Sequence, residues 1–319
     1  MDAVPYEFCA DVMAALDLRV DQYVDIANEL PPLWKAAAKE CSRKVHDYYV
    51  YIYKFEGGWW CVVYAGIARA PPVRSLNELL SKNRRFLTFS YVRMDDGRRK
   101  HQNAFPCSTD DLKKLASFLR LCMRPRSSIT FDVNEPPLVP LDALKICQSF
   151  RSLTLRYYGV ESSAFLEAQI TNNSNLRNLL LTGCWPPTEF HEQLLVKFLS
   201  SSADITLELR PPPGSKEPCL NVNLVIAKAT FHSWLRVKSF RFISTEGYTT
   251  LTEEEILSIS LPGTLNRNSN RCLGHRRFRW CRKRGSCLLF SHRINGPNVI
   301  RSNVCSDHKN VDWSNVNSS

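Results

Sequence analysis

The sequence lacks any long hydrophobic run. Its longest apolar stretch, residues 59–68, is far shorter than the roughly 20 residues that a bilayer-spanning helix needs. The first residues, 1–5, have neither the basic nor the apolar segment of a secretory signal. We therefore expect a protein without a membrane partner, located in the cytoplasm or the nucleus.

Paired cysteines and catalytic signatures are also missing. The 12 cysteines never form a Cys-x-x-Cys pair, and in a reducing compartment scattered cysteines are typical small buried side chains. No Gly-x-x-x-x-Gly-Lys, His-Glu-x-x-His or Gly-x-Ser-x-Gly occurs. We therefore predict no enzyme, no cofactor and no metal site. A catalytic Cys–His pair whose members come together only when the chain folds remains an open alternative.

Acidic residues are scarce at the carboxyl end. Residues 266–319 contain 11 Lys and Arg and two acidic residues, Asp307 and Asp312, so they carry +9 of the net charge of +11. The rest of the chain carries +2. Residues 263–319 are rich in Asn, Ser and Arg, a composition typical of a disordered basic tail. Aromatic and basic residues alternate at 275–284, which suits RNA binding or nuclear localisation. The alternative is a solvated tail that binds polyanions without specificity.

The strongest pattern present is a short apolar signature, big–x–x–big–x–big, that recurs between Arg126 and Thr245. Helix-like segments separate these strand-like ones, so each unit is a strand, a turn and a helix. Such a unit cannot bury its apolar face alone and must stack on its neighbours. We therefore predict an α/β fold, with an irregular strand–helix array over residues 45–262. The central apolar residues of the signature are Ile129, Leu153, Leu179, Leu207 and Phe240.

The array resembles degenerate leucine-rich repeats, since Asn134 and Cys184 fall where such repeats place Asn or Cys. In such arrays the outward-pointing strand side chains form a concave face that binds a partner protein. Any single residue of this face can equally be an ordinary surface residue. The candidates for target binding are Thr154, Arg156, Tyr157, Asn178, Leu180, Glu208 and Arg210.

An aromatic hairpin begins the array. Residues 45–55 are almost continuous β-formers, Gly57-Gly58 predicts a two-residue turn, and residues 59–64 form the return strand. Because both faces are apolar, we expect the pair to be buried between helices rather than exposed to a partner. The basic run at 98–101 is interpreted as a solvated strand edge rather than a phosphate-binding site.

Residues 4–41 predict three short helices. They contain Val4-Pro5-x-Glu7, an apolar pair near Val12 and Leu16, and a tryptophan in a closing Leu-Trp-Lys helix. This segment resembles a divergent F-box, a module that inserts into a Skp-type adaptor of a cullin ubiquitin ligase. Val4 replaces the usual Leu. The spacing from Leu16 to Trp34 is longer than usual, and Pro31-Pro32 interrupts it. The adaptor contacts that the resemblance implies are Pro5, Phe8, Val12, Leu16 and Trp34.

The whole arrangement resembles a large family of F-box-associated proteins that is expanded in nematodes. The resemblance implies an F-box-like helical module at 1–44, the repeat array at 45–262 and the tail at 263–319. It further implies a non-catalytic receptor that links an unknown target protein to the ligase. Two alternatives stay open. Residues 4–41 can instead cap the array of a scaffold without ligase connection, or the tail can bind nucleic acid.

Overall fold

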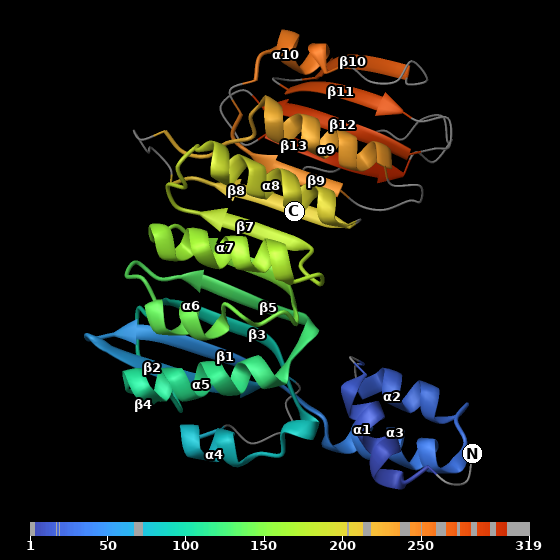
Figure 1. Cartoon of the computed structure of the whole chain (residues 1–319), viewed down its shortest axis with the longest axis vertical. Helices are drawn as coiled ribbons and strands as arrows, with labels where there is room; N and C mark the ends of the chain where they lie inside the picture. The colour runs from blue at the N-terminus through green and yellow to red at the C-terminus, as the bar shows by residue number, and fades with distance from the viewer. Residues whose placement is uncertain are drawn as a thin grey trace. The chain divides into compact units, whose positions relative to one another are not determined.

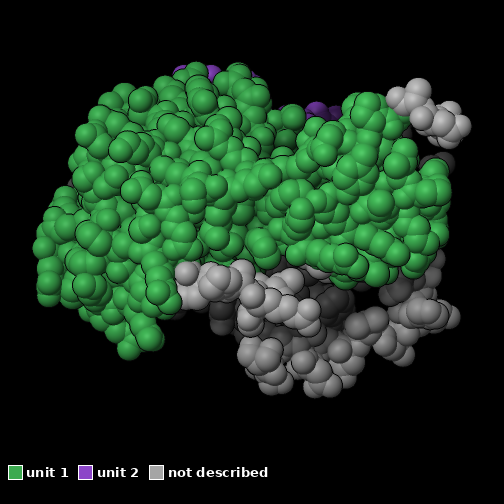
Figure 2. All heavy atoms as spheres, turned by 90° about the horizontal axis from the view of Figure 1, so that it is seen from below, with its two compact units in different colours: residues 1–182 green, residues 183–319 purple. Residues whose placement is uncertain are grey.

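The computed structural model describes most of the chain, which forms two compact units, Met1–Thr182 and Gly183–Ser319, coloured separately in Figure 2. The described residues are 4–16, 18, 20–66, 73–202, 204–212, 218–236, 243–249, 251–259, 266–272, 275–281, 286–293 and 298–304.

Unit 1 begins with the three predicted helices, α1 (Tyr6–Ala15), α2 (Val20–Ala27) and α3 (Pro32–Lys44). Pro32 occupies the first turn of α3, where its missing N–H would have had no helical partner. The helices share an interior of small, sulfur-containing and aromatic side chains. These include Cys9, Ala10, Met13, Tyr23, Ala37 and Cys41. This bundle therefore has a core of its own.

The rest of unit 1 is built on a mixed sheet with strand order β4-β2-β1-β3-β5-β6-β7. Strands β1, β3, β5, β6 and β7 run parallel to one another. At one edge, β2 pairs antiparallel to β1, and β4 pairs antiparallel to β2. Ile129 pairs with Leu153 and Leu153 with Leu179, so the repeated signature forms neighbouring rungs, as predicted. The strands are β1 (His46–Phe55), β2 (Gly58–Ala65), β3 (Leu87–Asp96), β4 (Phe105–Cys107), β5 (Met123–Asp132), β6 (Phe150–Arg156) and β7 (Asn178–Thr182).

Helices cover one face of this sheet, and Figure 1 shows α5, α6 and α7 side by side along it. Phe131 of β5 meets Phe165 of α7 edge-on, with ring centroids 5.5 Å apart. Ser108 caps the start of α5, in a capping box with Asp111. The elements between the strands are α4 (Leu76–Ser81), the 3-10 helix η1 (Arg84–Phe86), α5 (Thr109–Cys122), α6 (Leu138–Leu144) and α7 (Val160–Asn172).

Unit 2 continues the alternation of strand and helix. Strands β8 (Ile205–Arg210) and β9 (Ile243–Gly247) are parallel, and Leu207 lies beside Thr245. Phe240, the predicted centre of the last signature, lies outside the described residues. Thr188 caps α8 and Thr252 caps α10. The helices are α8 (Glu189–Ser201), α9 (Leu224–Arg236) and α10 (Glu253–Ser258).

After β9, the structure describes the backbone of four further strands within residues 266–304. It describes the backbone of an antiparallel meander that continues from β9 through β13, β12 and β11 to β10. The strands are β10 (Asn266–Cys272), β11 (His275–Cys281), β12 (Ser286–Arg293) and β13 (Asn298–Val304).

Candidate functional site

The residues predicted to contact an adaptor lie at the surface of the helical bundle. Phe8 is 53% and Leu16 40% exposed, Pro5 is exposed, and Val12 and Trp34 are half-buried. The rings of Phe8 on α1 and Trp34 on α3 meet edge-on, with centroids 6.2 Å apart. The fold therefore brings two of the predicted residues, from distant parts of the segment, into one aromatic pair.

Arg85 links the bundle to the rest of unit 1. Its guanidinium donates to the Glu7 carboxylate at 2.8 Å and, through Nε, to Asp11 at 2.7 Å. Phe86 places its side chain in the bundle core. The carboxylates of Glu7 and Asp11 are mostly exposed, so each ion pair contributes modestly to stability.

Three of the predicted target-binding residues lie on the face of the unit 1 sheet opposite the helices. Thr154 and Asn178 are half-buried on β6 and β7, and the Asn178 amide donates to Ser152 Oγ at 2.8 Å. Arg156 lies 3.9 Å from the Asp132 carboxylate of β5. This face, which we call the open face, therefore carries a polar surface across β5, β6 and β7.

Of the other four predicted target-binding residues, Leu180 also lies on the open face and three lie elsewhere. Tyr157 follows β6, and its backbone N–H donates to the Thr182 carbonyl at 3.0 Å. Leu180, on β7, lies beside Thr154 on the open face. Glu208 and Arg210 are on β8 in unit 2, where they form an ion pair with each other. The prediction therefore spans two units, and only its β6 and β7 residues share the open face of unit 1.

The aromatic hairpin departs from its prediction in both turn and burial. The turn residues are Glu56 and Gly57, which both have positive φ, one position before the predicted pair. Along β1, Tyr48 is 1% exposed whereas Tyr49 is 40% exposed. The expectation that both faces are buried is therefore wrong at Tyr49, because α5 covers the Tyr48 side, where Phe89 packs on Phe118. Farther along the Tyr49 side, Tyr53 is buried.

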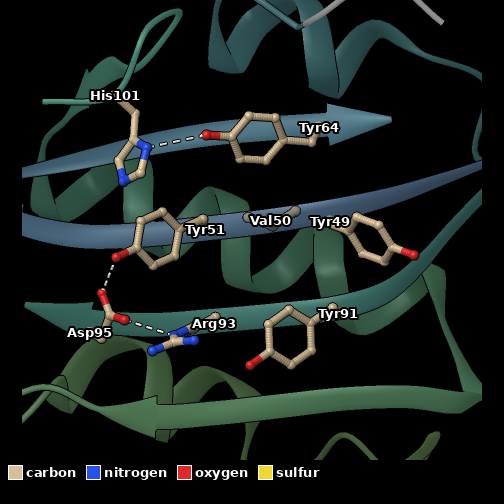
Figure 3. A pocket seen from close by; sticks show the side chains of 8 residues that line it. All are labelled: Tyr49, Val50, Tyr51, Tyr64, Tyr91, Arg93, Asp95 and His101. Carbon is tan, nitrogen blue, oxygen red and sulfur yellow. Dashed lines mark hydrogen bonds and ion pairs between the residues drawn. The ribbon is translucent and has the colours of Figure 1, made fainter. Parts of the chain in front are cut away.

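A pocket of about 350 Å³ opens on this uncovered side of the hairpin. The register places Tyr49 between Tyr64 of β2 and Tyr91 of β3, so three tyrosines form one row across adjacent strands (Figure 3). We call it the tyrosine pocket. It is lined by Tyr49, Val50, Tyr51, Tyr64, Tyr91, Arg93, Asp95 and His101.

A polar network closes one end of the tyrosine pocket. The Tyr51 hydroxyl donates to the Asp95 carboxylate, which also accepts from Arg93 Nε at 2.7 Å (Figure 3). Burial raises the pKa of Tyr51, and the hydrogen bond to Asp95 raises it further, because both disfavour the phenolate. Tyr51 therefore remains a neutral donor, and Arg93 balances the charge of Asp95.

The basic run at 98–101 lies in the loop between β3 and β4 rather than on a strand edge. The His101 N–H donates to the Tyr53 hydroxyl at 3.0 Å, and its ring lies 5.0 Å from the rings of both Tyr51 and Tyr53. Lys100 Nζ lies 3.9 Å from the Trp60 ring centroid. Aromatic residues of the hairpin therefore hold this loop against the tyrosine pocket.

A second depression, of about 450 Å³, adjoins the tyrosine pocket and shares Tyr64 and His101 with it. The Tyr64 hydroxyl and His101 Nδ1 lie 3.3 Å apart at this boundary. Arg99, Lys100, Gln102 and Asn103 complete the lining, and we call it the basic depression. None of the described residues that line it carries a carboxylate.

The cysteines of the helical and sheet regions act as packing groups. Burial raises the pKa of Cys41 and Cys122 to about 11, so the reactive thiolate is disfavoured. Among the described residues, no cluster of His, Cys, Asp and Glu is placed to hold a metal ion. The groups that gather on the open face are hydrogen-bonding, aromatic and charged, a combination typical of recognition surfaces.

Compared with protein-family models and with curated proteins, the chain matches none of them. Across the described ranges, no helix combines the length and the apolar character that crossing a membrane requires.

Proposed function

We propose that this protein is a non-catalytic substrate receptor, in which the α1–α3 bundle binds a Skp-type adaptor of a cullin ubiquitin ligase. The open face of unit 1 would then bind the target protein. The receptor contributes proximity, because it holds the target beside the subunits that transfer ubiquitin.

The observation that carries this proposal is the exposed apolar surface of a bundle that already has a complete core. Phe8 and Leu16 are joined at the bundle surface by Val24 and Leu33, which are also exposed. Among them, Phe8 contacts the half-buried Trp34 ring, and an exposed apolar pair of this kind is typical of a protein-binding surface. The F-box resemblance supplies the identity of the partner.

Co-purification of the full-length chain with a Skp-type adaptor tests the proposal. We expect the wild type to bind and Phe8→Ala combined with Trp34→Ala to lose at least tenfold in affinity, about 1.4 kcal/mol. Phe190→Ala is the matched control, since it removes an equally exposed ring from α8 in unit 2. Failure of the wild type to bind, or equal binding by the double variant, contradicts the proposal.

The alternative is a scaffold in which the bundle caps the sheet, and the link from Arg85 to Glu7 and Asp11 favours it. A cap serves stability, so Arg85→Ala would then lower the melting temperature, while adaptor binding would be absent from the wild type. The same purified proteins provide both measurements.

A further inference from the structure

We infer that the tyrosine pocket and the basic depression form one recognition site for an acidic peptide segment of the target protein. A proline or aromatic side chain of the peptide occupies the tyrosine pocket, and a neighbouring carboxylate lies at Arg99 and Lys100. This inference rests on the proposed function only in taking the partner to be a protein.

The tyrosine pocket supplies an apolar contact surface that is already ordered. Tyr49 and Tyr64 are exposed neighbours on paired strands, and Tyr91 extends the row onto β3. The Tyr91 hydroxyl lies 3.3 Å from Thr130 Oγ1, and this contact fixes the Tyr91 ring from the β5 side. Tyrosine rings on strands offer a large contact area at little entropic cost, and aromatic-lined grooves bind proline-rich and aromatic segments.

The basic depression supplies the charge complement. Within the described part of the chain, neither Arg99 nor Lys100 has a carboxylate within ion-pair distance. The contact between Lys100 and the Trp60 ring holds the ammonium group at the rim without neutralising it. The nearest acid in the adjoining pocket, Asp95, is already engaged by Arg93 and Tyr51. A carboxylate is therefore the side chain that this rim accepts.

The same features favour a peptide over single-stranded nucleic acid. A base-binding sheet needs free ring faces and a continuous track of cations for the phosphates. Tyr51 stacks on Tyr53 at 5.1 Å and meets the His101 ring edge, so its face is occupied. Asp95 and Asp132 pair in register across β3 and β5, so carboxylates interrupt the open face beside the pocket.

Selection of peptides from a random 12-residue library on the full-length protein tests the inference. We expect the selected sequences to carry Asp or Glu within a few positions of Pro, Phe, Tyr or Trp. Their affinity should fall at least tenfold on Arg99→Ala with Lys100→Ala, and as much on Tyr91→Ala. The matched controls, Lys39→Ala and Tyr248→Ala, change exposed residues that line neither the tyrosine pocket nor the basic depression, and should leave affinity unchanged.

Three results would overturn the inference. These are a selection without acidic enrichment, selected peptides whose affinity the site variants leave unchanged, and tighter binding of a labelled oligouridine RNA that the same variants abolish. The selection contains no adaptor, so its failure leaves the adaptor co-purification standing. Loss of adaptor binding likewise leaves the peptide result intact.

Discussion

The two faces of the unit 1 sheet carry similar residues but differ in what covers them. Tyr48 and Tyr49 are neighbours in sequence and point to opposite sides of β1. Tyr48 is buried beside Phe89, under α5, whereas Tyr49 is exposed in the tyrosine pocket. An aromatic residue on a strand thus marks the core only where a second layer lies over it. The covered face supports the fold, and the exposed part of the open face is where we propose that recognition takes place.

The largest expected effect tests the covered face. Phe131→Ala should lower the free energy of unfolding by about 3–5 kcal/mol, because its fully buried ring packs on Phe165 and its removal leaves a cavity. Tyr91→Ala, on the open face, should cost about 1 kcal/mol or less. Urea denaturation of the full-length variants measures both. Equal losses would mean that the open face has a covering layer, and the comparison would fail.

A smaller effect is expected where the loop at 97–104 approaches the open face. A Cβ added at Gly97 would lie 2.2 Å from Cδ2 of the buried Tyr53 ring, so Gly97→Ala should cost about 1–3 kcal/mol and displace His101. Gly58→Ala is the matched control, because its nearest contact would be 3.7 Å away. Thermal denaturation compares the two, and a wild-type melting temperature for Gly97→Ala would show that the loop is not held against Tyr53.

The smallest effect depends on pH. Tyr51→Phe removes the hydrogen bond to Asp95, which should lower the free energy of unfolding by about 1 kcal/mol or less, since the pair is partly exposed. Folding raises the pKa of Tyr51 above its ordinary value of 10.0. This stabilisation is therefore fully present below pH 10 and is lost as the pH rises further. Denaturation at several pH values should show the difference from wild type shrinking above pH 10, and a growing difference would contradict it.

Elements that depend on local sequence were predictable. Ser108, Thr188 and Thr252 were recognisable as helix caps because a cap and its partner lie three residues apart. The pairing of Leu153 with Leu179 followed from the repeated apolar signature. The hairpin turn was misplaced by one residue, because a positive φ is unfavourable for Glu56 and the sequence favoured Gly57-Gly58.

The tyrosine pocket was not predictable, because its contacts join residues that are distant in sequence. Tyr51 and Asp95 are separated by 44 positions, and Tyr53 and His101 by 48. The signal that could have found it was the combination of an aromatic hairpin with the basic run at 98–101. Taken separately, these patterns were assigned to a buried core and to a strand edge.

The sequence by itself determined the alternation of strands and helices and the apolar rungs of the sheet, because both periodicities are set by residues a few positions apart. Only the tertiary structure decided that helices cover a single face of that sheet. Alternation places side chains on two faces without specifying which one another layer will bury. The exposure of Tyr49, and with it the candidate site, comes from that single-sided packing.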